Sequence, residues 1–193
     1  ELSLLDGVRY RQVGADLFRG FYSVSSGVFS AQFRVPKDIT YGGNNGRVSA
    51  FAWDALGRTA FGDIEDLDIT GTASNVESDR EGPTIRMSFE GNEAFKSGDK
   101  VMGVPLLRVN IFDSSGLNIT GETGHEIELY IDNDESVKLT DRFNVEGGDY
   151  REGVLEYSLL GLEAGTHILA LKAWDTHNNS SRAEVNFELI KKD

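Results

Sequence analysis

Short stretches of the chain alternate between hydrophobic and polar residues, while the spacing of an amphipathic helix is almost absent. Alternation with a period of two places successive side chains on opposite faces of a strand, so each stretch predicts a half-buried β-strand. After residue 83, about seven such stretches follow one another at the spacing of an immunoglobulin-like β-sandwich. They are TIRMSFE, LLRVNIF, HEIELYID, VKLTDRF, VLEYSLL, THILALKAW and AEVNFELI. The pattern therefore predicts an antiparallel sandwich over residues 84–193.

The first part of the chain carries a second, smaller set of alternating stretches. In GVFSAQFRVP the apolar residues from Phe29 to Val35 share one face, and the preceding Ser-Ser-Gly at residues 25–27 is typical of a hairpin turn. The stretches RVSAFAWD and FGDIEDLDI predict a further strand pair around a turn at residues 55–58. Residues 1–70 thus form a predicted β-sandwich unit. We expect this unit to need a missing N-terminal strand, or its neighbour, to close its sheet.

Between the two units, the stretch GTASNVESDREGP at residues 71–83 is polar and has no periodicity. It ends in Gly-Pro, which is typical of a linker. The predicted fold class of the whole chain is therefore all-β, with two antiparallel β-sandwich units of which the second is immunoglobulin-like.

The tripeptide Ala-Trp-Asp occurs twice, ending at Asp54 and at Asp175. Each time it closes a predicted strand and precedes a polar turn. An aspartate in this place can accept hydrogen bonds from the backbone of the turn that follows it. We interpret the repeat as one type of hairpin used in both units, and not as a binding site.

Composition excludes several classes of function. The chain of 193 residues has a net charge of −13, which argues against a nucleic-acid partner because phosphates would be repelled. It has no cysteine, so disulfides, thiol nucleophiles and cysteine metal ligands are excluded. No apolar run approaches the roughly 20 residues that span a bilayer. Because the chain opens abruptly in ELSLLDG, we expect it to be part of a longer protein.

Three histidines are the candidates for acid–base chemistry. By alternation His167 faces inward, which predicts a hydrogen-bonded core side chain. His177 lies in the DTHNN turn, where we expect it to be solvated. His125 opens a strand, and no nucleophile pattern surrounds it. Since a Gly-x-Ser-x-Gly motif is missing as well, we assign no catalytic residue and expect no enzyme activity from this chain.

Acidic residues raise the question of a metal. Asp132, Asp134 and Glu135 lie together in the IDNDES turn, and Asp113 ends another predicted strand. Carboxylates at loop ends are ligands that Ca²⁺ prefers, but the EF-hand spacing is absent. We therefore interpret the turn as an acidic hairpin turn and predict no metal and no other cofactor. Ca²⁺ at Asp132 and Asp134, or at Asp113, is the alternative that the sequence leaves open.

Carbohydrate binding would require aromatic side chains exposed on one face. The candidates are Trp53, Trp174, Tyr130 and Tyr150, but they fall in different predicted strands, which favours ordinary packing. The triplet Asn118-Ile119-Thr120 matches the N-glycosylation sequon, which also arises by chance.

Four stretches in order are more specific than a generic sandwich. They are FRVPKDITY, GRVSAFAWD, GLNITGETGHEIELYID and GVLEYSLLGLEAGTHILALKAWDTHNNSS. Together they resemble the C-terminal region of the type IX secretion sortases of the Bacteroidetes, in the gingipain-like cysteine peptidase family C25. The resemblance spans nearly all of the chain. It departs at Glu126, where the family more often has aspartate after the Gly-His pair.

The resemblance implies accessory β-sandwich domains of an enzyme whose Cys–His pair lies in an upstream domain. Such an enzyme would cleave C-terminal sorting signals from secreted cargo and attach the cargo to surface lipopolysaccharide. The implied partners are the upstream peptidase domain of the same chain, outer-membrane proteins of the secretion system, and cargo sorting domains. The implied location is the cell surface or outer membrane of a Gram-negative bacterium. A carbohydrate-binding or adhesive surface sandwich is the alternative, and an independent enzyme is a third class.

Overall fold

The computed structural model describes residues 2–5, 8–11, 14–37, 39, 45–74, 78–121, 124–134 and 136–190. In this part of the chain the regular structure is strand, apart from the short 3-10 helix η1 (Thr140–Arg142). The strands are β1 (Leu2–Leu5), β2 (Val8–Arg11), β3 (Gly46–Trp53), β4 (Thr59–Leu67), β5 (Thr84–Phe89), β6 (Lys100–Met102), β7 (Leu106–Phe112), β8 (Glu128–Ile131), β9 (Val137–Lys138), β10 (Asn144–Val145), β11 (Glu152–Ser158), β12 (Gly165–Trp174) and β13 (Ser180–Ile190). The prediction of an all-β fold built from antiparallel sheets is confirmed.

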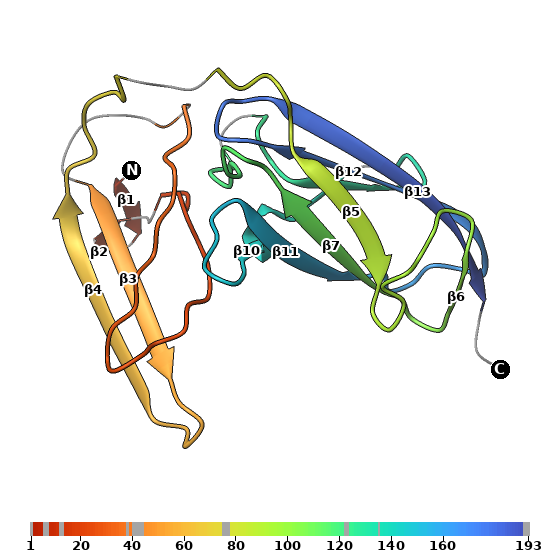
Figure 1. Cartoon of the computed structure of the whole chain (residues 1–193), viewed down its shortest axis with the longest axis horizontal. Helices are drawn as coiled ribbons and strands as arrows, with labels where there is room; N and C mark the ends of the chain where they lie inside the picture. Colours follow the sequence, from red (N-terminus) through yellow and green to blue (C-terminus); the bar gives the residue numbers. More distant parts are fainter. Residues whose placement is uncertain are drawn as a thin grey trace. The chain divides into compact units, whose positions relative to one another are not determined.

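Contacts divide the chain into two units, and Figure 1 labels strands of both. The larger unit combines residues 1–38 with residues 79–193, and the smaller unit consists of residues 39–78. This division differs from the predicted one, in which residues 1–70 were grouped together and a second unit began at residue 84. The physical reason is that the segment before residue 38 bonds to the sandwich, as described below.

The larger unit is a sandwich of two sheets. One sheet has the strand order β10-β11-β7-β5, and the other has the order β6-β13-β12-β8-β9. Neighbouring strands are antiparallel in both sheets, except that β6 runs parallel to β13. In Figure 1 the green and yellow strands β7 and β5 form one layer and the blue strands β12 and β13 form the other. A separate two-stranded sheet pairs β1 with β2.

The core lies between these two sheets and is filled by alternate side chains. In β12, Leu169, Leu171 and Ala173 are fully buried, while Lys172 and Trp174 on the opposite face remain partly exposed. Burying one leucine side chain contributes about 2 kcal/mol to the free energy of folding. The buried apolar side chains between the two sheets therefore make the largest favourable contribution to the stability of the larger unit. The largest other buried side chains are Leu107, Val109, Ile111, Ile127, Leu129, Leu139, Phe143, Leu155 and Phe187.

The strands predicted for this region are present. Six of the predicted stretches contain a strand of four or more residues, whereas VKLTDRF forms a strand only at Val137–Lys138 and then turns into η1. Strands β6 and β10 were not predicted. They have three and two residues, which is too short for alternation to be recognised.

Residues 14–37 run as an irregular segment of the larger unit. The predicted hairpin turn is present, since Ser25 and Val28 exchange backbone hydrogen bonds of 2.9 and 3.0 Å and both central residues have positive φ. The predicted strand from Phe29 to Val35 is wrong, because these residues join no strand ladder. Their side chains make local contacts instead, and Phe33 stacks on Phe18 with ring centroids 5.2 Å apart.

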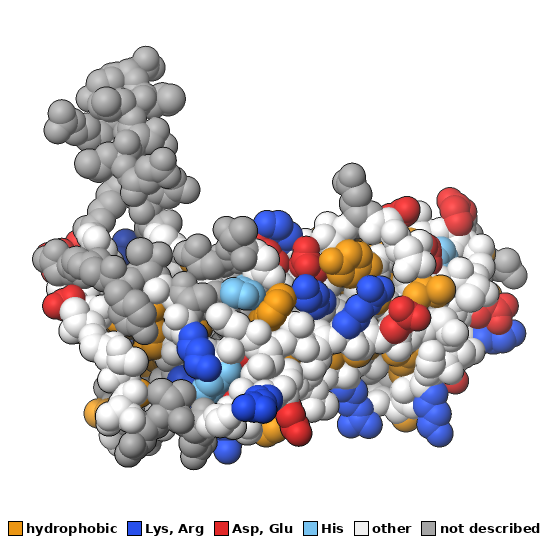
Figure 2. All heavy atoms as spheres, turned by 90° about the horizontal axis from the view of Figure 1, so that it is seen from above, with side chains coloured by type: hydrophobic (Ala, Val, Ile, Leu, Met, Phe, Trp, Pro, Cys, Tyr) orange, Lys and Arg blue, Asp and Glu red, His pale blue; other side chains and the backbone are white. Residues whose placement is uncertain are grey.

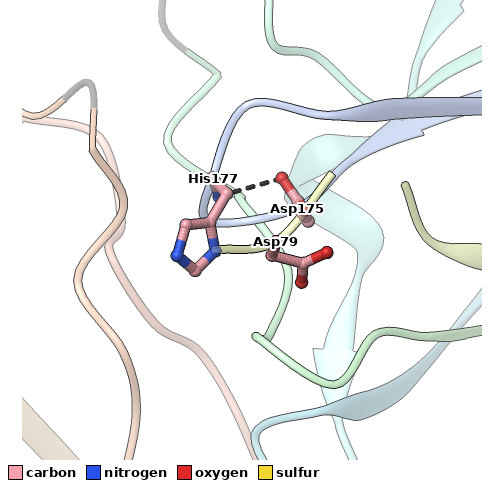
Figure 3. A group of neighbouring side chains, drawn as sticks. All are labelled: Asp79, Asp175 and His177. Carbon is pink, nitrogen blue, oxygen red and sulfur yellow. Dashed lines mark hydrogen bonds between the residues drawn. The ribbon is translucent and has the colours of Figure 1, made fainter. Parts of the chain in front are cut away.

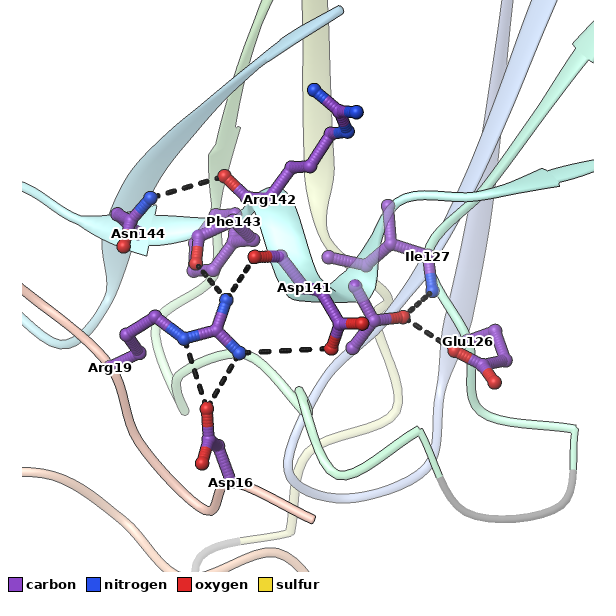
Figure 4. A network of polar contacts seen from close by, with 9 residues as sticks. Asp16, Arg19, Glu126, Ile127, Asp141, Arg142, Phe143 and Asn144 are labelled. Atoms are coloured by element: carbon purple, nitrogen blue, oxygen red, sulfur yellow. Dashed lines mark hydrogen bonds and ion pairs between the residues drawn. The ribbon is translucent and has the colours of Figure 1, made fainter.

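Arg19 fastens this segment to the sandwich, as Figure 4 shows. Its guanidinium donates to the carboxylate of Asp16, with N–O distances of 2.6 and 2.9 Å. It also donates to the backbone carbonyl oxygens of Asp141 and Phe143, which flank the end of η1. One cation thus joins an acidic side chain of its own segment to two carbonyl groups of the sandwich.

Next to Arg19, the segment pairs with the edge of the sheet. Gly20 and Val145 of β10 form a parallel bridge, in which Val145 donates to Arg19 O at 3.0 Å and Phe21 donates to Val145 O at 3.1 Å. A Cβ atom at position 20 would lie 2.9 Å from Val145 Cβ, so only glycine allows the two backbones to approach this closely. Residues 19–21 therefore cover the outer edge of β10.

The smaller unit is the hairpin of β3 and β4. The strands pair in antiparallel register, with a shift between Gly46 and Val48. Because side chains alternate, Phe51, Trp53 and Phe61 point to the same side of the hairpin, and their exposed fractions are 59%, 61% and 65%. We call these three residues the aromatic face. Two strands alone bury little apolar surface, so this hairpin has little intrinsic stability.

Both Ala-Trp-Asp tripeptides have the predicted architectural role. Strands β3 and β12 end at their tryptophans, and the aspartates that follow organise the turns. In each turn the aspartate Oδ1 accepts from the backbone N–H groups two and four residues later. The distances are 2.9 and 3.0 Å for Asp54, and 2.9 and 2.7 Å for Asp175. The same local chemistry therefore closes one hairpin in each unit.

Candidate functional site

The turn between β12 and β13 gathers polar groups in the interior. Asp175 is 0% exposed, and besides the two backbone donors its Oδ2 accepts from Asn179 Nδ2 at 2.7 Å. Asn178 adopts a φ of 68°, a left-handed conformation that asparagine tolerates better than most residues. The turn is thus built around a buried carboxylate that receives three hydrogen bonds.

Two further carboxylates come to this turn from other parts of the larger unit. Asp79 precedes β5, and its backbone carbonyl accepts from Asn179 Nδ2 at 3.3 Å. Asp113 directly follows β7 and is buried. One potential ligand atom from each of Asp79, Asp175 and His177 lies within 4.8 Å of the other two. Figure 3 shows these three side chains close to one another beside the turn.

The pKa values of the carboxylates in this cluster are shifted by burial, hydrogen bonds and neighbouring charges. Burial raises the pKa of Asp113 above its ordinary value, and the charges of Asp175 and Asp79 raise it further. The hydrogen bonds from Ser115 lower this pKa, but they do not cancel the increase. Both the backbone N–H and the hydroxyl of Ser115 donate to Asp113 Oδ1 at 2.7 Å. In contrast, the pKa of Asp79 is lowered, chiefly by the backbone N–H of Glu81 and also by Ser115 and His177. The cluster therefore carries carboxylates under mutual repulsion.

His177 is the unexpected member of this site. Its exposed fraction is 8%, so the prediction of a solvated side chain is wrong. The Nδ1 atom is buried and has no hydrogen-bond partner among the described residues, and the same holds for Oδ1 of the neighbouring Asn178. Buried polar atoms without partners are rare in folded proteins because desolvation is not compensated.

His167 occupies the predicted core position and is fully hydrogen-bonded. Its Nδ1 lies 2.7 Å from Asp132 Oδ2, and its Nε2 lies 2.7 Å from the carbonyl oxygen of Glu163. Asp132 also accepts from the backbone N–H of Ile168 at 2.8 Å. Burial alone would lower the pKa of His167, but the bonds to Asp132 and Glu163 outweigh it, so that the pKa is raised. The pair ties the β8–β9 turn to β12.

This pair predicts a pH-dependent stability. Because the pKa of His167 is raised on folding, its contribution is fully present below the unfolded value of about 6.5 and is lost as pH rises through the folded pKa. Urea unfolding between about pH 5.5 and 8.5 should show this decline. His167→Gln should flatten this decline. A wild-type protein whose stability does not fall across this range relative to His167→Gln would contradict the assignment.

The acidic turn that was considered for Ca²⁺ does not form the cluster. Asp132 is engaged by His167 and Ile168, Asp134 is exposed, and Glu135 lies outside the described residues. Among the predicted acidic candidates that the structure describes, Asp113 is the one that lies at the cluster. Asp79 was missed because it lies in the polar stretch interpreted as a linker. The signal that could have pointed to the site is the Asp-Thr-His sequence at residues 175–177, which places a carboxylate and an imidazole in one turn.

The predicted aromatic candidates do not come together. Trp174 is covered by Lys172, whose Nζ lies 4.5 Å from its ring centroid, and by the ring of His125 at 4.5 Å. Tyr130 lies under Arg182 at 5.3 Å, and Tyr150 is partly buried. Cations over these rings occupy the faces on which a sugar would stack. Trp53 instead belongs to the aromatic face of the hairpin.

The sequon has a structural role. Asn118 is 0% exposed, and its Oδ1 accepts from the backbone N–H and the hydroxyl of Thr120 at 3.0 and 2.8 Å. Its side chain is therefore inaccessible in the folded protein and closes a local turn.

Two pockets of the larger unit are not lined by histidine. One, between residues 17–34 and the sandwich, has a volume of about 10 Å³, which is room for about one water molecule. The other is an open depression of about 420 Å³, lined by Phe21, Arg142 and Glu156 among others. Neither place combines an imidazole with carboxylates.

The visible surface carries charges of both signs. On the face shown in Figure 2, basic and acidic side chains are interspersed over the residues that are coloured by type. Within the described part of the chain, no helix has the length and apolar character required to cross a membrane.

Comparison with known proteins gives one informative similarity. No protein-family model and no curated protein matches the chain. Among solved structures, dimeric latent PorU from Porphyromonas gingivalis aligns over 92% of the chain, with 29% identity and a TM-score of 0.58. An endo-β-1,4-mannanase from Thermotoga petrophila covers 60% of the chain and 21% of its own length, at 15% identity and a TM-score of 0.38. The chain spans only 17% of PorU. Its fold is therefore similar, over nearly the whole chain, to that of one region of PorU.

Proposed function

We propose that the chain is a noncatalytic region of a type IX sortase-like cysteine peptidase at the cell surface of a Gram-negative bacterium. The observation that carries this proposal is the similarity to PorU over 92% of the chain at 29% identity. The four stretches that resemble type IX sortases support the same class. The parent enzyme would cleave sorting signals from cargo and attach the cargo to lipopolysaccharide, with a cysteine nucleophile outside this chain, which has no cysteine.

In this proposal the sandwich supports the peptidase domain and the hairpin docks a partner. The sandwich suits a supporting role because a core of alternate side chains from two sheets makes a rigid body. The hairpin suits docking because its aromatic face is exposed and β4 is exposed along its whole length. Exposed strand edges and apolar faces are surfaces to which another β-rich domain can add.

Sequencing the gene on both sides of the chain tests the assignment to a peptidase. A domain with a Cys–His pair upstream in the same reading frame is the expected result. An array of similar sandwiches, or a lipoprotein start directly before the chain, would contradict the assignment and favour an adhesive protein.

A binding assay tests the docking role separately. Purified cargo sorting domains should be retained by the immobilised chain, and the double variant Phe51→Ser/Phe61→Ser should bind at least about tenfold more weakly, since two exposed aromatic contacts are lost. The matched control is Leu160→Ser, which removes an apolar side chain that is 75% exposed on the sandwich. No retention by the wild type, or equal affinity of the double variant, would contradict docking at the aromatic face.

A carbohydrate-binding or adhesive sandwich is the second candidate function. The observation that favours it is the stacking of Phe51 and Trp53, whose ring centroids are 6.0 Å apart at an interplanar angle of 28°. Exposed aromatic rings in similar orientation can stack on sugars. A glycan array distinguishes the two functions, because signal that is lost in Trp53→Ala supports this candidate and uniform absence of signal rejects it.

A further inference from the structure

We infer that Asp79, Asp175 and His177 bind a divalent transition-metal ion of the Zn²⁺ type at the turn between β12 and β13. The potential ligand atoms of the three residues already lie within 4.8 Å of one another. They come from two separate segments of the larger unit, one before β5 and one after β12. This inference does not rest on the proposed function, because it is argued from the side chains at the turn between β12 and β13 and not from the similarity to PorU.

The buried imidazole is a second observation that points to a ligand. His177 is 8% exposed, and its Nδ1 has no hydrogen-bond partner among the described residues. Figure 3 shows the ring beside the two carboxylates, with one ring nitrogen turned towards Asp79. An imidazole nitrogen that is desolvated without a partner costs free energy, and coordination to a metal removes that cost.

The equivalent turn of the hairpin, which follows Asp54, shows which features of the Asp175 turn are needed to close a hairpin and which are not. Asp54 accepts the same two backbone hydrogen bonds as Asp175, and Arg58 donates to its Oδ2 as Asn179 donates to that of Asp175. At the position of His177 this turn has Leu56, which is 79% exposed. Closing the hairpin therefore explains the aspartate, but it requires neither a buried histidine nor a second carboxylate.

The donor set selects the class of metal. Two carboxylates and one imidazole form a mixed oxygen and nitrogen set, which suits Zn²⁺ and related ions, whereas Ca²⁺ takes six to eight oxygen ligands. In a tetrahedral Zn²⁺ site the ligand atoms lie about 3.4 Å apart, so the ligand atoms, which lie within 4.8 Å of one another, must approach by at most about 1.4 Å. Asp79 can make this movement because it is partly exposed and lies outside the strands. A water molecule would complete the coordination.

The charge of the surroundings also favours a cation. Asp113 adds a third carboxylate whose charge interacts with those of Asp79 and Asp175, and burial raises its pKa. A bound divalent cation would offset the repulsion among the three. It would also join the start of the segment before β5 to the turn after β12, which gives the ion a structural role.

Metal titration of the stripped chain tests this inference. After treatment with EDTA and dialysis, calorimetry should show one equivalent of Zn²⁺ binding, and thermal unfolding should shift to higher temperature. Co²⁺ should give the visible absorption of a low-coordinate site. His177→Gln and Asp79→Asn should each weaken binding at least about tenfold, because each removes one of three protein ligands. The matched control His125→Gln should bind like the wild type.

Three results would overturn the site. They are absence of Zn²⁺ binding to the wild type at millimolar metal, undiminished binding by Asp79→Asn and His177→Gln, and binding of Ca²⁺ in place of Zn²⁺. Thermal unfolding of each metal-free variant checks that it is folded. Asp79→Asn keeps the inference testable if His177→Gln does not fold, because Asp79 is partly exposed and its replacement is close to isosteric.

Discussion

Gly153→Ala is expected to destabilise the larger unit by about 3 kcal/mol, although it adds a single methyl group. A Cβ atom at position 153 would lie 2.3 Å from Phe143 Cζ and 2.4 Å from the backbone oxygen of Asn144. The ring of Phe143 is 1% exposed and packs over this glycine in β11, and the backbone oxygen belongs to β10. The backbone oxygen of Asn144 cannot move without disturbing the pairing of β10 with β11, and the ring of Phe143 is held in the core. Urea unfolding monitored by circular dichroism measures the loss.

The control for this change is Gly14→Ala. A Cβ atom at position 14 meets no atom of the described residues within 4 Å, and its backbone is not left-handed. Adding the methyl group there should leave stability unchanged or raise it slightly, because alanine restricts the unfolded chain. If the two variants unfold at the same urea concentration, Phe143 does not pack on β11 as described.

Asp175→Ala is expected to cost about 3 kcal/mol, since it leaves three buried or half-buried donors without an acceptor. These donors are the backbone N–H groups of His177 and Asn179, and the side-chain amide of Asn179. Asp175→Asn keeps one acceptor oxygen and should cost less. Thermal and urea unfolding of both variants measure this order.

The equivalent change in the hairpin, Asp54→Ala, provides the comparison. Asp54 makes the same backbone contacts, but its turn is exposed and water can replace the lost acceptor. We therefore expect Asp54→Ala to cost much less stability in its own unit, the hairpin, than Asp175→Ala costs in the larger unit. Equal losses from Asp54→Ala and Asp175→Ala would show that burial of the turn does not determine the cost.

The sequence predicted those parts of the fold in which local pattern and burial coincide. Leu169, Leu171 and Ala173 alternate in β12 and are fully buried, because one face of that strand meets the opposite sheet. The Asp-turn contacts were predictable for the same reason, since an aspartate and the backbone of the next four residues suffice to form them. Local chemistry determines both features.

The parts that could not be predicted depend on contacts between distant residues. The stretch from Phe29 to Val35 alternates like a strand, yet it does not join a ladder, because a strand also requires a partner of suitable register. Asp79 and His177 are separated by nearly a hundred residues, and only the tertiary contact of the segment before β5 with the β12–β13 turn brings their side chains together. Residues 19–21 likewise find β10 through tertiary pairing alone.

The smaller unit interrupts the larger one, because residues 39–78 separate the segment that covers β10 from the sandwich itself. Its length is therefore weakly constrained by the thermodynamics of its host. The entropic cost of closing a loop rises with the logarithm of its length, so doubling this insertion would cost only about 0.6 kcal/mol. During divergence, additions and losses of chain should accumulate here, while the segment around Arg19 and the sandwich keep their spacing.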